Sequence, residues 1–160
     1  MREIKFRGMD INGNWHYGNL AILKQKVGVA EAGSYISNSV GVPFAYDVRP
    51  ETVGQYIDVL DKNGKEIYMG DLIKKVGENL KGNFEMTPSK IGDIYFVVHM
   101  NCGYVLCPIK CFGKLAKNCD GELIPNIWGY IHNYEFWNGA RTGAEVIGNI
   151  YENPELKGDK

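Results

Sequence analysis

The feature that most constrains the fold of this chain is a pair of Asn-Gly dipeptides, each placed between short runs of alternating apolar residues. Asn12-Gly13 precedes the run at 15–23, and Asn63-Gly64 precedes the run at 67–68. Asn-Gly favours the positive backbone φ of two-residue hairpin turns of the primed types. The pattern therefore predicts two β-hairpins and a chain built mainly from strands.

Three further runs have the apolar composition of strands. They lie at 72–76, at 91–100 and at 127–137, where aromatic side chains occupy alternate positions. Gly70-Asp71 marks a turn directly before the first of them. Residues 24–41 have a lower density of apolar side chains and several glycines, so we expect a loop or a weak strand there.

One segment, residues 108–118, has helical periodicity instead. Its apolar side chains fall on one face at 100° per residue, and Lys110, Lys114 and Lys117 fall on the opposite face. The pattern predicts a short amphipathic helix of three turns. The fold class that follows is mainly β (a β-rich α+β chain): a small barrel or a strongly bent antiparallel sheet, SH3-like in part, with this one helix.

Length and charge limit the classes of protein. The chain has 160 residues, which predicts one domain over 1–160, with a possible subdivision near 45–60 and a frayed tail at 157–160. Its net charge of −1 excludes the strongly basic class of nucleic-acid-binding proteins. The chain has neither a long apolar stretch nor the apolar region of a signal peptide, so we expect a cytoplasmic protein without a membrane partner.

Four cysteines, Cys102, Cys107, Cys111 and Cys119, lie in one short region. Their spacing lacks the Cys-x2-Cys pairs that direct two thiolates at one zinc ion, so we expect reduced thiols, no metal and no cofactor. His99 lies three residues before the first cysteine, and this pair is where an enzyme acting on a small molecule would be sought. No third residue that would orient the pair can be identified, so we favour a protein that is not an enzyme.

Both of these Asn-Gly dipeptides follow an aspartate, in the segments Asp10–Asn14 and Asp61–Glu66. Calcium loops also begin with aspartate, but they place glycine at position six and a bidentate glutamate at position twelve. Glycine is fourth in both segments here. We interpret both segments as turns rather than ion sites.

A dense aromatic stripe suggests a contact surface. It contains Trp128, Tyr130, Tyr134, Phe136 and Trp137, and no Lys or Arg lies among them. Bases stack on aromatic platforms that sit in cationic grooves, which this stripe lacks. Aromatic residues with little charge are typical of the centre of a protein interface, so the stripe predicts a closed homo-oligomer.

Five segments that bracket nearly the whole chain share their pattern with a known family. They are Arg2–Arg7, Pro50–Tyr56, Asp61–Tyr68, Gly70–Ile73 and Val146–Leu156. In these segments the chain resembles the YopX family of phage and prophage proteins. Residues 24–45 and 77–127 carry none of the resemblance.

Two places depart from the family's pattern. Gly8-Met9 stands where the family tends to have a small residue and an aromatic, and Ile57–Val59 replaces a more usual Thr-Gly-Leu run. The turn residues within the shared segments have sufficient structural reasons to be there and do not mark a site. These turn residues, together with those of the first hairpin, are Asn12, Gly13, Asn63, Gly64, Gly70 and Asp71.

The resemblance implies a phage- or prophage-encoded, mostly β protein without an established activity. We therefore expect an accessory protein in the cytoplasm of a bacterial host, acting by homo-oligomeric assembly or by binding an unknown phage or host protein. The first alternative is a weak nucleic-acid-binding protein that uses Lys110, Lys114 and Lys117. The second is the small-molecule enzyme.

Overall fold

The computed structural model describes residues 3–38, 45–77, 90–100, 103–109, 115–117, 123–125 and 143–157. The chain divides into two compact units, Met1–Asp58 and Val59–Lys160. The boundary between them falls inside β5. No helix among the described residues is long and apolar enough to cross a membrane.

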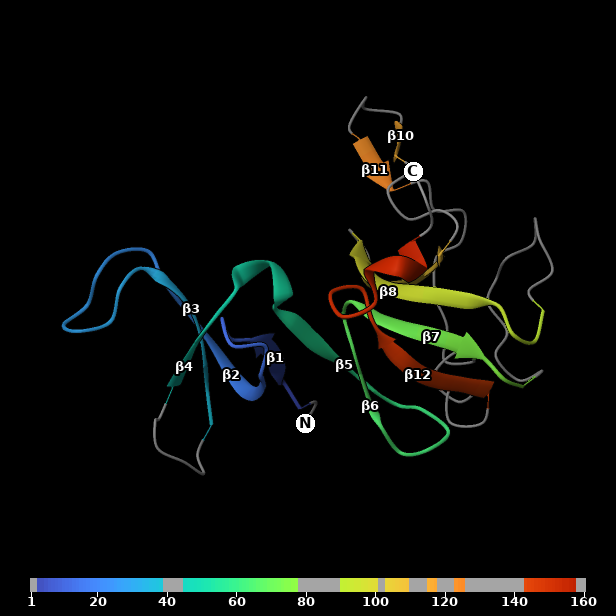
Figure 1. Ribbon diagram of the computed structural model, residues 1–160, viewed down its shortest axis with the longest axis horizontal. Coiled ribbons are helices and arrows are strands. Elements are labelled where there is room, and N and C mark those ends of the chain that lie inside the picture. Colours follow the sequence, from blue (N-terminus) through green and yellow to red (C-terminus); the bar gives the residue numbers. More distant parts are fainter. Residues whose placement is uncertain are drawn as a thin grey trace. The chain divides into compact units, whose positions relative to one another are not determined.

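The first unit is an antiparallel sheet in the order β4-β3-β2-β1-β5 (Figure 1). The hairpin predicted around Asn12-Gly13 is confirmed, because β1 and β2 are its two strands. The elements are β1 (Phe6–Met9), β2 (Trp15–Leu23), β3 (Gly33–Ser37), β4 (Ala45–Val48), the 3-10 turn η1 (Pro50–Thr52) and β5 (Gly54–Leu60).

This sheet is strongly bent. β1 pairs with residues 15–18 of β2, whereas β3 pairs with residues 19–23. Directly after β4, the backbone N–H of Arg49 donates to the carbonyl of Met9 on β1, at 2.8 Å. The bent antiparallel sheet expected from the sequence is thus present, and the described strands do not close into the small barrel that was its alternative.

A tight contact at Gly8 packs the inside of the bend. Ile36 and Val48 are buried there, and a Cβ atom added at Gly8 would lie 2.7 Å from Cγ2 of Val48. Real Cβ atoms are not found so close to another side chain. The strand β1 can therefore approach β3 and β4 only with glycine at this position.

The second unit contains a four-stranded antiparallel sheet in the order β12-β7-β8-β9 and a two-stranded sheet, β10-β11. Leu72, Phe96 and Cys107 form one buried hydrophobic cluster of this unit, from β7, β8 and β9. The elements are β6 (Glu66–Tyr68), which follows β5 in the sheet order, β7 (Asp71–Lys75), β8 (Ile94–Met100), β9 (Gly103–Pro108), β10 (Leu115–Lys117), β11 (Leu123–Pro125), β12 (Ala144–Asn149) and the 3-10 turn η3 (Pro154–Lys157).

The strands predicted at 72–76 and 91–100 are confirmed as β7 and β8, but the amphipathic helix predicted over 108–118 is wrong. Pro108 ends β9, and residues 115–117 form β10, which pairs with β11. An apolar residue every three or four positions also fits a short strand when pairing with a neighbouring strand satisfies its backbone. The segment predicted as a strand at 127–137 lies outside the described residues.

The backbone of Asp58 is strained. Its φ is +64°, and it is the single described residue other than glycine with a positive φ. The left-handed conformation costs a residue with a Cβ roughly 1–2 kcal/mol relative to glycine. This is also the middle position of the Ile57–Val59 run, where the YopX pattern resembled above tends to have glycine.

We predict that Asp58→Gly leaves the fold intact and raises the free energy of unfolding by up to about 1 kcal/mol, because relief of strain exceeds the extra backbone entropy of glycine. Asp58→Val is the matched control and should lower it by about 1–3 kcal/mol, since a β-branched residue is poorly tolerated at positive φ. Urea unfolding measures both. A less stable Asp58→Gly variant would contradict the strain and assign a stabilising role to the Asp58 carboxylate.

Candidate functional site

The two aspartate turns share one hydrogen-bond pattern. In the first, Oδ1 of Asp10 accepts hydrogen bonds from the backbone N–H groups of Asn12, at 2.8 Å, and Asn14, at 2.9 Å. The N–H of Gly13 donates to the carbonyl of Asp10 at 3.2 Å. The carboxylate therefore holds the turn closed from within.

In the second turn, Oδ1 of Asp61 accepts from the N–H groups of Asn63, at 2.7 Å, and Lys65, at 2.9 Å. The N–H of Gly64 donates to the carbonyl of Asp61 at 3.0 Å. Position by position, these bonds repeat those of the first turn. The shared sequence is Asp-x-Asn-Gly-x.

The turn type differs from the one predicted. Gly13 and Gly64 have φ of +88° and +78°, whereas Asn12 and Asn63 are not among the residues with positive φ. Type I′ turns need positive φ at both central residues and type II′ turns need it at the first, so these are three-residue loops that end on a left-handed glycine. The aspartate explains the difference, because its side chain bonds to the backbone two residues further on.

The two turns differ in what the second carboxylate oxygen of the aspartate contacts. Oδ2 of Asp61 accepts from the N–H of Val146, which lies 85 residues later on β12, at 3.0 Å. The N–H of Lys62 donates to the carbonyl of Ala144 at 3.0 Å, and its ammonium pairs with Glu145, also at 3.0 Å. The turn thus covers the outer edge of β12, whose other edge pairs with β7.

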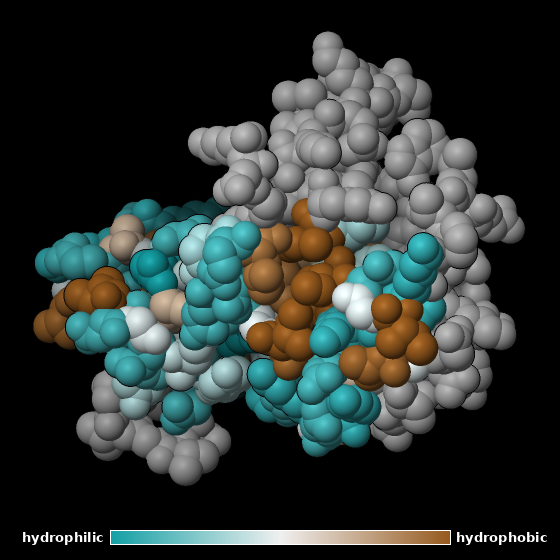
Figure 2. Space-filling view, turned by 45° about the vertical axis from the view of Figure 1, so that its right-hand side comes forward, coloured by the Kyte–Doolittle hydropathy of each residue, from teal (hydrophilic) through white to brown (hydrophobic). Residues whose placement is uncertain are grey.

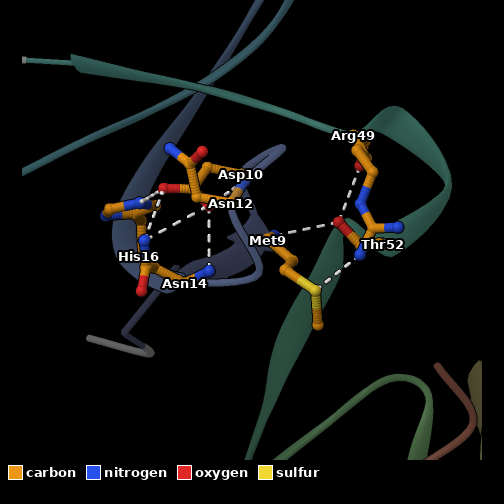
Figure 3. Close-up of polar contacts among 7 residues, drawn as sticks. All are labelled: Met9, Asp10, Asn12, Asn14, His16, Arg49 and Thr52. Atoms are coloured by element: carbon orange, nitrogen blue, oxygen red, sulfur yellow. Dashed lines mark hydrogen bonds and ion pairs between the residues drawn. The ribbon is translucent and has the colours of Figure 1, made fainter. Parts of the chain in front are cut away.

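In the first turn, Oδ2 of Asp10 meets side chains instead (Figure 3). It accepts from Nδ2 of Asn14 at 3.1 Å and lies 2.9 Å from Nε2 of His16. The His16 ring stacks on Tyr46 of β4, with ring centroids 3.7 Å apart. The hydrogen bond from His16 has the largest effect on the pKa of Asp10, and the bond from the N–H of Asn14 has the next largest. Together they hold this pKa well below its ordinary range.

A second polar cluster in Figure 3 attaches η1 to β1. The hydroxyl of Thr52 accepts from the N–H of Met9 at 2.9 Å and donates to the carbonyl of Arg49 at 2.7 Å. The Arg49 guanidinium reaches the sulfur of Met9. Thr52 is buried, so these bonds are structural rather than available to a ligand.

The other predicted turn residues are also placed. Gly70 has φ of +88°, and its carbonyl accepts from the N–H of Ile150 at 3.0 Å. Oδ2 of the buried Asp71 accepts from the N–H of Tyr68 at 2.8 Å. Both residues close the turn between β6 and β7.

Most of the other predicted site residues lie outside the described part of the chain. Lys117 is described and ends the strand β10, so the helical face that would align it with the other two lysines is not formed there. The residues outside are Cys102, Lys110, Cys111, Lys114, Cys119, Trp128, Tyr130, Tyr134, Phe136 and Trp137.

Of the predicted cysteine and histidine sites, two residues are described. Cys107 is a buried free thiol in the core of the second unit. His99 lies edge-on to Tyr104, its cross-strand partner on β9, with ring centroids 5.3 Å apart. The described residues bring no three His, Cys, Asp or Glu side chains together in a way that could hold a metal ion.

The sequence analysis missed an ordered hairpin between β2 and β3. Val27 and Ala30 exchange two backbone hydrogen bonds, of 2.9 and 3.1 Å, and Gly28 has φ of +61°. Positive φ at the first of two central residues is the type II′ turn that closes hairpins. In the sequence, Gly28 between two valines could have indicated this hairpin turn. The lower apolar density around it instead favoured a loop or a weak strand.

This hairpin displays apolar side chains. Val29 is fully exposed at the turn, and Val27 and Ile22 are 58% and 64% exposed. Figure 2 shows hydrophobic side chains gathered at the outer end of the hairpin, beside hydrophilic ones. We define the strand end 19–23 together with the turn 24–32 as the β2–β3 arm.

The comparisons with known proteins can be set beside this geometry. The family model described as YopX protein matches residues 5–156. The chain belongs to the YopX family. The resemblance carried by the five segments is thereby confirmed.

A solved structure supports the fold. The chain is similar to protein EF1440 from Enterococcus faecalis, known from a crystal structure, with 18% sequence identity and a TM-score of 0.51. The similarity covers 99% of this chain and 100% of that one. At this identity the likeness concerns the fold alone. No match was found among curated proteins.

We predict that Asp61→Asn destabilises the protein by about 2–4 kcal/mol, because its amide group would point a donor at the N–H of Val146 in a buried place. Asp10→Asn is the matched change in the other turn and should cost clearly less, since that carboxylate is near the surface. Urea unfolding of the two variants compares them directly. Equal losses would contradict the assignment of the edge of β12 to Asp61.

We also predict a pH dependence for the first turn. Asp10 has a lower pKa when folded than its ordinary 3.8, so its ionised form stabilises the fold above that pH and the effect declines as the pH falls further. The difference in melting temperature between the wild type and Asp10→Asn should therefore shrink as the pH is lowered from 7 to 3. These two pH values lie about three units above and about one unit below the ordinary pKa of 3.8. Adding His16→Gln should flatten this dependence. A constant difference would contradict it.

Proposed function

We propose that this YopX protein is a phage- or prophage-encoded accessory protein that acts by homo-oligomeric assembly or by binding a protein partner, without catalysing a reaction. The observation that carries the proposal is the β2–β3 arm, an ordered element that holds apolar side chains in solvent. Exposed apolar side chains on an ordered backbone are typical of protein contact surfaces.

The use of the polar groups supports this function. The carboxylates of Asp10 and Asp61 each accept several hydrogen bonds from their own chain, so their oxygens are engaged in holding turns and a strand edge. A general base or a metal ligand needs a carboxylate oxygen that faces its substrate or ion. These two aspartates are therefore assigned to the scaffold.

The apolar surface of the first unit also supports a function in protein contacts. Large apolar side chains are exposed on β2, on the turn after it and before β1. They are Ile4, Tyr17, Ile22, Val27 and Val29. The aromatic stripe at 128–137 is the second contact surface that we propose, on the sequence argument given above.

We expect sedimentation equilibrium at micromolar concentration to give a species heavier than the 18.0 kDa chain. Added duplex DNA should cause no salt-dependent shift of the protein in a gel. Lys117 lies in the strand β10, so the helix that would align the three lysines for DNA binding is not formed there. A single species at the monomer mass would contradict assembly. Tight DNA binding at physiological salt would favour the nucleic-acid alternative instead.

A further inference from the structure

We propose that the free edge of the β2–β3 arm is a homodimer contact, in which two copies pair their β2 strands antiparallel about a two-fold axis at Ile22. This inference rests on the proposed function and names the surface and the partner, which is a second copy of this chain. It concerns residues of the first unit alone.

The edge arises because β2 changes partners half-way along. Its residues 15–18 pair with β1, and its residues 19–23 pair with β3 on the opposite side. On the β1 side, no strand among the described residues pairs with 19–23. The backbone groups along this side form an open strand edge, which is a template for pairing with another chain.

The side chains next to this edge favour its burial. Ile22 is 64% exposed on β2, and Val27 and Val29 extend the apolar surface toward the turn. In an antiparallel pair centred on Ile22, the two copies of this side chain lie directly opposite each other on one face of the combined sheet. Isolated exposed apolar residues are common, but here they coincide with an unpaired edge.

The arm is ordered before any partner binds. The two backbone hydrogen bonds between Val27 and Ala30 close its turn. Lys26 forms an ion pair with Glu31 across the arm, and the hydroxyl of Tyr35 donates to the carbonyl of Glu31 at 3.0 Å. Pairing through such an element costs little conformational entropy.

Charge disfavours one alternative register of the pairing. From Ile11 to Ala30 the chain has no acidic residue, and its two cations in this stretch are Lys24 and Lys26. Centred on Ile22, the pairing places Lys24 opposite Leu20 of the partner subunit, which is an uncharged residue. A pairing centred nearer the turn, at Gln25, would place Lys24 opposite Lys26 of the partner subunit, which like-charge repulsion disfavours.

The symmetry of this arrangement is closed. In a two-fold pairing, residue i contacts residue j and residue j contacts residue i, so each copy uses its edge once and no free edge remains there. The pairing therefore yields dimers rather than fibres. This outcome removes the hazard that an exposed strand edge presents.

Ile22→Lys in the full chain tests the contact. It places two lysines opposite each other at the two-fold axis, so the dissociation constant from sedimentation equilibrium should rise by at least about tenfold. Ile11→Lys is the matched control, an exposed isoleucine at the other hairpin, and should change the constant by no more than about threefold. Circular dichroism and the melting temperature check that both variants remain folded.

A cysteine pair provides a second measurement. Oxidised Ile22→Cys should give a covalent dimer on a non-reducing gel, because residues directly opposite in antiparallel strands bring their Cβ atoms to about 4.5–5.5 Å. Ile11→Cys and the wild type should not. A wild-type dimer that Ile22→Lys leaves unchanged and Ile22→Cys does not cross-link overturns this surface while homo-oligomeric assembly stands. A wild type that is monomeric throughout overturns both.

Discussion

The carboxylate of Asp61 is the interaction on which the second unit depends. It is buried, and three backbone N–H groups point at its two oxygens, two from its own turn and one from Val146. Because charged acceptors make strong hydrogen bonds and buried N–H groups are costly to leave unbonded, this one side chain fixes the turn and the last strand together. This turn, rather than another strand among the described residues, covers the edge of β12. The bond from Val146 to Asp61 thus ties the turn after β5 to β12.

The same Asp-x-Asn-Gly-x turn occurs twice and is used differently. Its first carboxylate oxygen closes the loop at both places, whereas the second oxygen meets Val146 in one unit and His16 in the other. Val146 lies far from the turn at Asp61, whereas the second oxygen of Asp10 also accepts from Asn14 of its own turn. The first carboxylate oxygen therefore closes the turn locally, and the surrounding fold decides which further groups the second oxygen binds.

The segments that carry the family's pattern meet one another in space. Asp61 and Gly70 bond to the segment Val146–Leu156, and the N–H of Tyr56 donates to the carbonyl of Lys5. These contacts build the scaffold of each unit. The β2–β3 arm lies outside those five segments, and the positive φ of Asp58 shows that the scaffold tolerates local strain.

The sequence alone determined the first hairpin, the strands at 72–76 and 91–100 and the membership of the YopX family, because alternating side chains and Asn-Gly turns are local properties and the family's pattern is a property of the sequence. It misjudged the segment 108–118, since four apolar positions at helical spacing do not exclude the strand β10 once β11 is available as a partner. It also missed the arm. Val29 is exposed because no other part of the described fold covers the turn, and the local sequence does not encode this. Only the tertiary structure decided that Asp61 reaches Val146 and that β2 leaves one edge open, because both depend on residues far apart in the chain, whose approach no local pattern encodes.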